Sequence, residues 1–277
     1  MTSIVFLHHS VGAGLIDQGG LRELLSTAGY RFYDHGYNED GLTLPSGERA
    51  PYTFNIPNDN TDPDGLARIF TQPPDLSDWS DATPPVNTFS GLLRSDTIVF
   101  KSCFPASGIA SDEQLGQYKN HYLTIRSVVD QHPDHLFIAL GMPPLDPWST
   151  NTRDAARARA FTDWLKSPEY LTGHPNLFVI DLFDLLAESD SSRRDYNMLR
   201  AEYRPGDGNA LQPKTIVKGA LNSALVLVGA DRRIGQGNSH PNERANRAVG
   251  PLVAQAIETA IQTYSGARLQ TLAARPA

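Results

Sequence analysis

The stretch from Ile4 to Gly14 constrains the fold of this chain more than any other. The apolar run Ile4-Val5-Phe6-Leu7 leads directly into His8-His9-Ser10, and Gly12 and Gly14 follow. A short apolar run that ends in polar residues and glycines predicts a buried strand turning into a helix. Ligands of open α/β sheets bind at the carboxyl ends of the strands. We therefore expect Ser10 at such an edge, with the two glycines letting the backbone approach a ligand closely.

Apolar runs of strand length alternate with stretches of helical periodicity along the rest of the chain. This alternation predicts βαβ units and a parallel sheet, here an α/β fold with a mostly parallel five-stranded sheet. One domain is expected over residues 1–265, followed by a loosely attached tail at 266–277. The predicted strands are 4–7, 31–33, 96–100, 135–140 and 176–180, and the predicted helices are 15–28, 63–70, 111–131, 154–166 and 241–264.

Residues 39–94 form a long segment rich in Pro, Asn, Asp, Gly and Thr. Such a stretch inside a compact domain is uncommon unless it is functional. We expect a loop excursion over the active-site edge, with one short helix at 63–70 and enough aromatic residues to pack. Residues 216–228 fit either a helix or an irregular strand.

The composition excludes several classes of protein. With 24 Lys and Arg against 31 Asp and Glu, the net charge of −7 argues against a nucleic-acid partner. No apolar run approaches the roughly 18 residues that span a bilayer, and no signal-peptide pattern is present. The sole cysteine, Cys103, cannot form an internal disulfide. The sequence therefore predicts a soluble, cytoplasmic protein with no membrane partner.

A second polar motif, Ser239-His240-Pro241-Asn242, opens the last predicted helix. Ser10 and His240 thus both stand at the boundaries of predicted elements, one near each end of the chain. A serine and a histidine placed in this way suggest a nucleophile and its general base.

These motifs resemble those of the SGNH or GDSL hydrolases. The stretch from His8 to Leu15 is similar to the family's first block, Gly-Asp-Ser-Leu followed by small residues, and residues 239–242 are similar to its last block, Asp-x-x-His-Pro. The resemblance implies a flavodoxin-like three-layer α/β/α sandwich. It also implies a serine esterase with Ser10 as the nucleophile and His240 as the base, needing neither a cofactor nor a metal.

The chain departs from the family pattern at two places, which makes it a divergent member. His8-His9 stands where the family has Gly-Asp, and Gly237 stands where the family has the triad aspartate. A carboxylate normally fixes the tautomer of the catalytic histidine and stabilises the imidazolium. Here we expect Asn238, a residue elsewhere such as Asp231, or a backbone carbonyl to orient His240.

The resemblance also directs attention to the oxyanion hole. The family's donors are a glycine N–H after the second strand and an asparagine after the third, which map to Gly36-Tyr37-Asn38 and to Lys101-Ser102-Cys103, where no asparagine stands. We expect Lys101 to be buried at a strand end and paired with a carboxylate. The predicted oxyanion and pocket residues are the Ser10 N–H, Gly36, Asn38, Lys101, Ser102 and His9.

The predicted function is ester hydrolysis through an acyl-enzyme, on an acetylated carbohydrate or another small ester. Acyl transfer to a different acceptor would use the same residues. Two further readings stay open: a binding protein that has lost its triad, and a metal-dependent enzyme whose ligands are His8, His9, His35 and His240. The sequence also leaves a homo-oligomer open.

Overall fold

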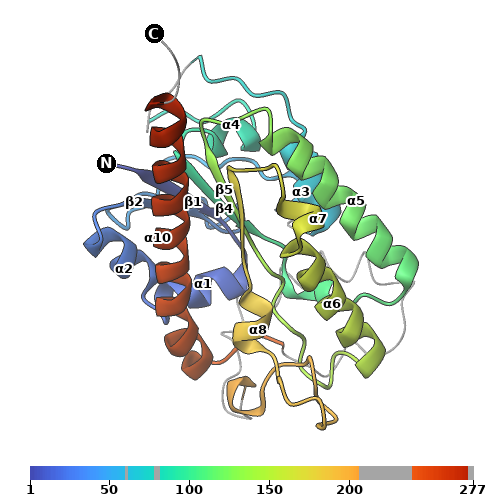
Figure 1. Cartoon of the computed structure of the whole chain (residues 1–277). Helices are drawn as coiled ribbons and strands as arrows, with labels where there is room; N and C mark the ends of the chain where they lie inside the picture. Colours follow the sequence, from blue (N-terminus) through green and yellow to red (C-terminus); the bar gives the residue numbers. More distant parts are fainter. Residues whose placement is uncertain (60–61, 78–81, 206–238, 274–277) are drawn as a thin grey trace.

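A six-stranded sheet organises the computed structural model, which describes residues 1–59, 62–77, 82–205 and 239–273. The strand order is β3-β2-β1-β4-β5-β6, and every neighbouring pair is parallel except β2 and β3 (Figure 1). Counted among themselves, the five parallel strands follow the flavodoxin-like order 2-1-3-4-5. The strands are β1 (Ser3–Leu7), β2 (Arg31–His35), β3 (Leu42–Thr43), β4 (Thr97–Lys101), β5 (Leu136–Leu140) and β6 (Leu177–Ile180).

Helices cover both faces of this sheet, so the α/β/α sandwich is confirmed (Figure 1). One face carries α1 (Ser10–Asp17), α2 (Leu21–Thr27), α8 (Leu182–Leu186) and α10 (Glu243–Ala273). The other carries α3 (Pro63–Phe70), α4 (Thr88–Leu92), α5 (Asp112–Val129), α6 (Thr152–Leu165) and α7 (Pro168–Leu171). Short 3₁₀ turns occur at Pro57–Asp59, Phe104–Ser107 and Ala201–Tyr203.

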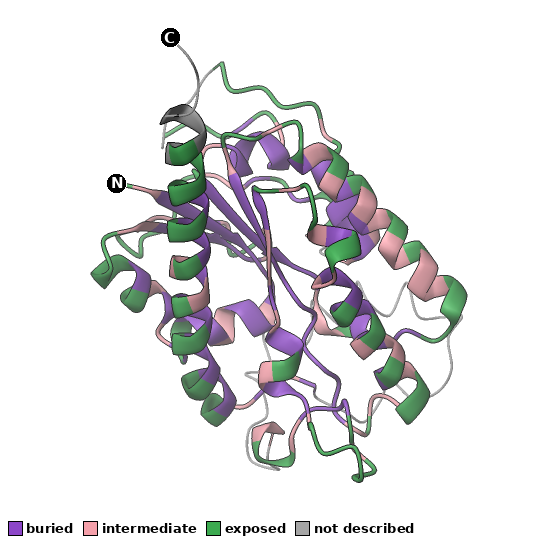
Figure 2. Cartoon of the chain, viewed as in Figure 1, coloured by how far each residue is buried: buried purple, intermediate pink, exposed green. Residues whose placement is uncertain are grey.

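Burial on both faces explains why the strands read as continuous apolar runs. Ile4 and Phe6 of β1 pack under α1 and α10, whereas Val5 and Leu7 pack with the helices of the other face. All residues of β1, β4 and β5 are buried, as Figure 2 shows for the centre of the sheet. Parallel strands covered on both sides lack the polar alternation of a half-exposed sheet.

The structure corrects several predicted boundaries. The five parallel strands are confirmed, and the sixth, β3, has only two residues and lies at the edge. The predicted helix 15–28 is two helices, because Gly20 adopts a left-handed conformation with φ of 71° at the start of α2. Residues 216–228 lie outside the described part of the chain.

The predicted loose tail at 266–277 begins within helix α10. Helix α10 continues to Ala273, and Arg268 donates a hydrogen bond of 3.0 Å to the carbonyl of Asp134. No helix in the described ranges is both long enough and apolar enough to cross a bilayer.

Parts of the 39–94 segment contribute to the core, among them α3 and α4. Phe54, Phe70 and Phe89 are each at most 2% exposed and pack in the cluster that includes Val5, on the α3–α5 face. Residues around 53–59 contact the predicted site through groups described below.

Glycines set the distance between α1 and α10. A Cβ atom on Gly250 would lie 2.2 Å from the carbonyl oxygen of Gly19, and one on Gly14 would lie 2.6 Å from Nδ2 of Asn246. A Cβ on Gly12 would lie 2.3 Å from Cβ of His8. The space beside Gly12 and Gly14 is thus taken by the side chains of His8 and Asn246, and the space beside Gly250 by the backbone of Gly19. That Gly12 and Gly14 let the backbone approach a ligand stays a prediction.

We expect Gly250→Ala to lower the free energy of unfolding by about 1–3 kcal/mol or more, because the added methyl group meets backbone that cannot move aside. The matched control is Gly116→Ala in α5, where nothing lies within 4 Å of the added Cβ. That substitution should raise stability by up to about 1 kcal/mol, since alanine is the better helix former. Urea denaturation checks both variants, and equal effects would contradict the close approach of α1 to α10.

Candidate active site

The structure brings Ser10 and His240 together at the carboxyl end of β1. Ser10 is the first residue of α1, and its Oγ lies 2.7 Å from Nε2 of His240, 230 positions along the chain. A hydroxyl that donates to an imidazole at this distance is the arrangement that activates a serine nucleophile.

A buried network holds the turn that carries Ser10. The backbone N–H of His8 donates to the carbonyl of His35 at 3.0 Å, extending the β1–β2 ladder by one residue. The His8 ring bridges the carbonyl of His9, at 2.9 Å, and Oδ2 of Asp34, at 3.1 Å. Arg22 forms an ion pair with the same carboxylate. His8 therefore fixes the backbone on both sides of the strand end.

Hydrogen bonds made by residues before and after His240 in the sequence hold the backbone that carries it. Ser239 is fully buried, and its Oγ accepts a hydrogen bond of 3.2 Å from the backbone N–H of Asp146. Asn242 caps α10 by accepting from the N–H of Ala245 at 3.0 Å. The edge of the Phe104 ring packs against the imidazole, with centroids 4.7 Å apart and an interplanar angle of 70°.

Burial and a nearby cation keep His240 neutral. Desolvation, with a smaller contribution from the charge of Lys101, lowers the pKa of His240 to about 4. The imidazole is thus in its basic form at neutral pH and can accept the Ser10 proton. The predicted orienting residues Asn238 and Asp231 lie outside the described residues, as does Gly237.

Lys101 and Ser102 lie beneath the site rather than in contact with solvent. Both are fully buried, and Nζ of Lys101 donates to the carbonyl of Ser102 at 3.1 Å. Ser102 Oγ lies 3.1 Å from the hydroxyl of Tyr122. Lys101 is buried, as expected, and burial lowers the pKa of its amine. Within the described part of the chain it pairs with no carboxylate, so the expected ion pair stays a prediction.

The two predicted donors after β2 differ in what they contact. The side-chain amide of Asn38 ties the loop to Ile56, donating to its carbonyl and accepting from its N–H, both at 2.8 Å. This favours a structural role for Asn38. The N–H of Gly36 donates to no group in the described ranges, so its role as an oxyanion donor stays a prediction.

The remaining histidines are built into the wall of the site. His9 stacks on Tyr37, with centroids 4.3 Å apart and planes 9° from parallel, and its ring also interacts with the backbone of Asp59. His35 lies 3.0 Å from the carbonyl of Gly36 and accepts from the N–H of Phe54 at 2.9 Å. No three His, Cys, Asp or Glu side chains of the described residues are grouped to hold a metal ion.

Two residues that the sequence prediction did not assign to the site also reach Ser10. The Tyr37 hydroxyl interacts with both the side chain and the backbone of Ser10, and the Cys103 thiol interacts with the Ser10 side chain. Burial raises the pKa of both groups. Tyr37 comes two residues after the end of β2, and Cys103 comes two residues after the end of β4. This position after a strand is the sequence signal that could have identified them.

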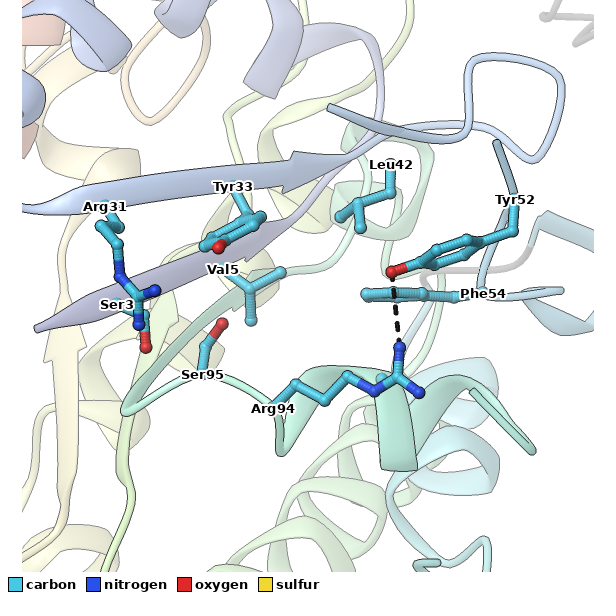
Figure 3. Close-up of a pocket in the computed structure, with 10 residues that line it drawn as sticks. Ser3, Val5, Arg31, Tyr33, Leu42, Tyr52, Phe54, Arg94 and Ser95 are labelled. Carbon is cyan, nitrogen blue, oxygen red and sulfur yellow. Dashed lines mark hydrogen bonds between the residues drawn. The ribbon is translucent and has the colours of Figure 1, made fainter. Parts of the chain in front are cut away.

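A small cavity lies away from this site, toward the amino ends of the strands (Figure 3). Arg94 reaches the Tyr52 hydroxyl there at 3.4 Å, and Arg31 lies beside Ser3. None of the predicted site residues lines this cavity.

No family model and no curated protein matches this chain. Solved structures with a similar arrangement include a "putative acylhydrolase" from Bacteroides fragilis, at 11% identity and a TM-score of 0.40, covering 93% of this chain and 87% of the other. A "possible lipase" from Chitinophaga pinensis has 9% identity and a TM-score of 0.41, covering 94% and 98%. A "putative platelet activating factor" from Streptococcus pneumonia has 16% identity and a TM-score of 0.39, covering 79% and 83%. The function proposed below rests on the geometry of the site.

The buried histidines predict a loss of stability in mild acid. Desolvation lowers the pKa of His8, His35 and His240 from 6.5 to about 4, and that of His9 to about 3. Between pH 6.5 and those values the unfolded chain binds protons that the folded chain excludes. The free energy of unfolding should therefore be highest above pH 6.5 and fall as the pH drops toward 4.

Urea denaturation between pH 7 and 5 measures this effect above the range in which most carboxyl groups titrate. His9→Phe keeps an aromatic ring against Tyr37 and should reduce the number of protons taken up on unfolding by about one. A flat stability profile over this range would show that the histidines are not buried in neutral form.

Proposed function

We propose that this chain is a serine-dependent ester hydrolase of the SGNH-like kind. The observation that carries the proposal is the hydrogen bond of 2.7 Å between Ser10 Oγ and His240 Nε2, at the carboxyl end of the central strand β1. The order of the parallel strands, with a serine after the first and a histidine before the last helix, supports the same assignment.

In the proposed reaction, Ser10 Oγ attacks the ester carbonyl carbon while its proton passes to Nε2 of His240. The carbonyl π electrons move to the oxygen and form a tetrahedral oxyanion. Collapse expels the alcohol, which takes the proton from His240, and leaves an acyl group on Ser10. Water then repeats the sequence and releases the acid. An alcohol acceptor in place of water would give acyl transfer with the same residues.

The surroundings of Ser10 favour a developing negative charge. Ser10 starts α1, so the positive end of the helix dipole lies at its position and favours a developing negative charge there. The buried Lys101 lies near the site, and in its protonated form it would add positive charge there, which also acts to lower the pKa of His240. Electrostatic stabilisation of the oxyanion is commonly the largest contribution to acyl-transfer catalysis.

The accessible part of the site favours a small acyl group. Ser10 and His240 are half-buried, and Tyr37, Cys103 and Phe104 beside them are also partly exposed. These neighbours are aromatic or weakly polar, and burial holds Tyr37 and Cys103 in their neutral forms. An uncharged acyl group such as acetyl, on a carbohydrate or another small alcohol, suits these surroundings.

Labelling by a fluorophosphonate tests the proposal directly. We expect the wild type to be labelled at Ser10 and to hydrolyse short p-nitrophenyl esters, and Ser10→Ala to lose both activities. His240→Ala should retain the fold and lose at least about 100-fold in turnover, because general-base assistance contributes about that much or more.

Ser127→Ala, on helix α5 of the opposite face, is the matched control and should match the wild type. A folded wild type that the reagent does not label would contradict the proposal and favour a binding protein on this fold. Activity lost to a chelator but retained in Ser10→Ala would favour a metal-dependent enzyme.

The pH profile of ester hydrolysis should reflect the neutral His240. Because burial and the charge of Lys101 lower its pKa to about 4, the base form persists into mild acid, and kcat/KM should fall only as the pH approaches 4. Lys101→Met removes the cation but keeps the volume, so the pKa of His240 should rise and the acidic limb should move to higher pH. An unchanged limb in Lys101→Met would show that Lys101 does not act on the base.

A further inference from the structure

Tyr37 lies against the proposed nucleophile although nothing in the reaction so far uses it. It follows Gly36 in the loop after β2, in a turn closed by hydrogen bonds to its carbonyl from the N–H groups of Asp40, at 2.8 Å, and Gly41, at 2.9 Å. Its ring stacks on His9, the residue immediately before Ser10, at 4.3 Å. The hydroxyl interacts with Ser10 through both the side chain and the backbone.

This double contact has a chemical meaning in acyl transfer. The oxyanion is the former carbonyl oxygen, attached to the carbon atom that has bonded to Ser Oγ. The backbone N–H of the nucleophilic serine commonly donates a hydrogen bond to it. A group that reaches both Oγ and the backbone of Ser10 therefore lies beside the position of the oxyanion. Further donors must come within about 3 Å of that position to be effective.

From this geometry we infer that the Tyr37 hydroxyl is a donor to the oxyanion, and so a catalytic residue of the proposed esterase. The inference rests on the proposed function. Tyr37 takes the role for which the sequence suggested Asn38, whose amide is instead bonded to Ile56. During the attack of Ser10, the Tyr37 O–H donates a hydrogen bond and transfers no proton, since the Ser10 proton passes to His240.

The protonation state of Tyr37 suits a donor. Burial raises the pKa of Tyr37 to about 12, so the phenol keeps its proton at any pH where the site would work. The stacked His9 ring restricts the motion of the phenol ring, which reduces the reorganisation needed when the oxyanion forms.

The same position of Tyr37 also allows an opposite effect on the reaction, which an experiment can distinguish from the donor role. The Tyr37 hydroxyl, which interacts with Ser10, could block the oxyanion position instead of supporting it. A donor predicts that loss of the hydroxyl slows the reaction. A block predicts that loss of the hydroxyl, or of the whole ring, makes the reaction faster.

The test measures kcat and KM for a short p-nitrophenyl ester in Tyr37→Phe, which keeps the stack on His9. We expect kcat to fall about 100-fold, as for the loss of one oxyanion donor, with KM changed less than about threefold. The rate of labelling by a fluorophosphonate should fall as well, because its phosphoryl oxygen occupies the same position. Tyr118→Phe, on α5 of the opposite face, is the matched control and should keep the wild-type rate.

Each outcome decides between the proposals. Turnover that depends on Ser10 but is equal or faster in Tyr37→Phe overturns the donor role alone. Turnover that does not depend on Ser10 overturns the proposed function and the donor role together. Tyr37→Ala keeps the test decisive if the phenylalanine variant is unstable, since a donor predicts slow turnover in folded Tyr37→Ala and a block predicts fast turnover.

Discussion

The close approach of α1 to α10 is the constraint on which the candidate site depends. Gly250 of α10 and Gly19, in the turn that follows α1, leave no room for a side chain between them, and Gly14 of α1 makes the same allowance for Asn246 of α10. With the helices at this distance, the residue that begins α1 and the residue shortly before α10 lie 2.7 Å apart at their polar atoms. Because proton transfer depends steeply on distance, small changes in helix packing would act directly on the chemistry.

A buried cation gives this site an unusual electrostatic balance. The charge of Lys101 opposes protonation of His8, His9 and His240, and desolvation opposes it more strongly. In the proposed reaction the same charge would favour the oxyanion that forms at Ser10 and oppose the imidazolium that forms at His240. Aromatic groups around the dyad, including Tyr37 and Phe104, limit the water that would otherwise screen these effects.

The sequence predicted those parts of the molecule that depend on local pattern. The apolar runs marked the five parallel strands, and Pro63 to Phe70 was predicted to its boundaries because Pro63 stands at the first helical position and Asp62 caps it. The pairing of Ser10 with His240 was suggested by their places at the boundaries of predicted elements and supported by the resemblance to a known family. Strand β3 has only two residues, too few to show the alternation of apolar and polar side chains that identifies a strand. The contacts of Asn38 with Ile56, and of Tyr37 with His9 and Ser10, join residues that are distant in the chain. No local pattern in the sequence encodes such contacts.

The span of 230 positions between Ser10 and His240 has a consequence for how the protein is made. A ribosome delivers the proposed nucleophile early and its proposed base late, and at about 5–20 residues per second the delay is roughly 10 to 50 s. Through that interval helix α10, which packs in the same apolar cluster as Ile4 and Phe6 of β1, has not yet been made. The nascent chain would therefore carry an inert serine beside an exposed sheet face, and catalytic competence and protection from aggregation would arrive in the same step of synthesis.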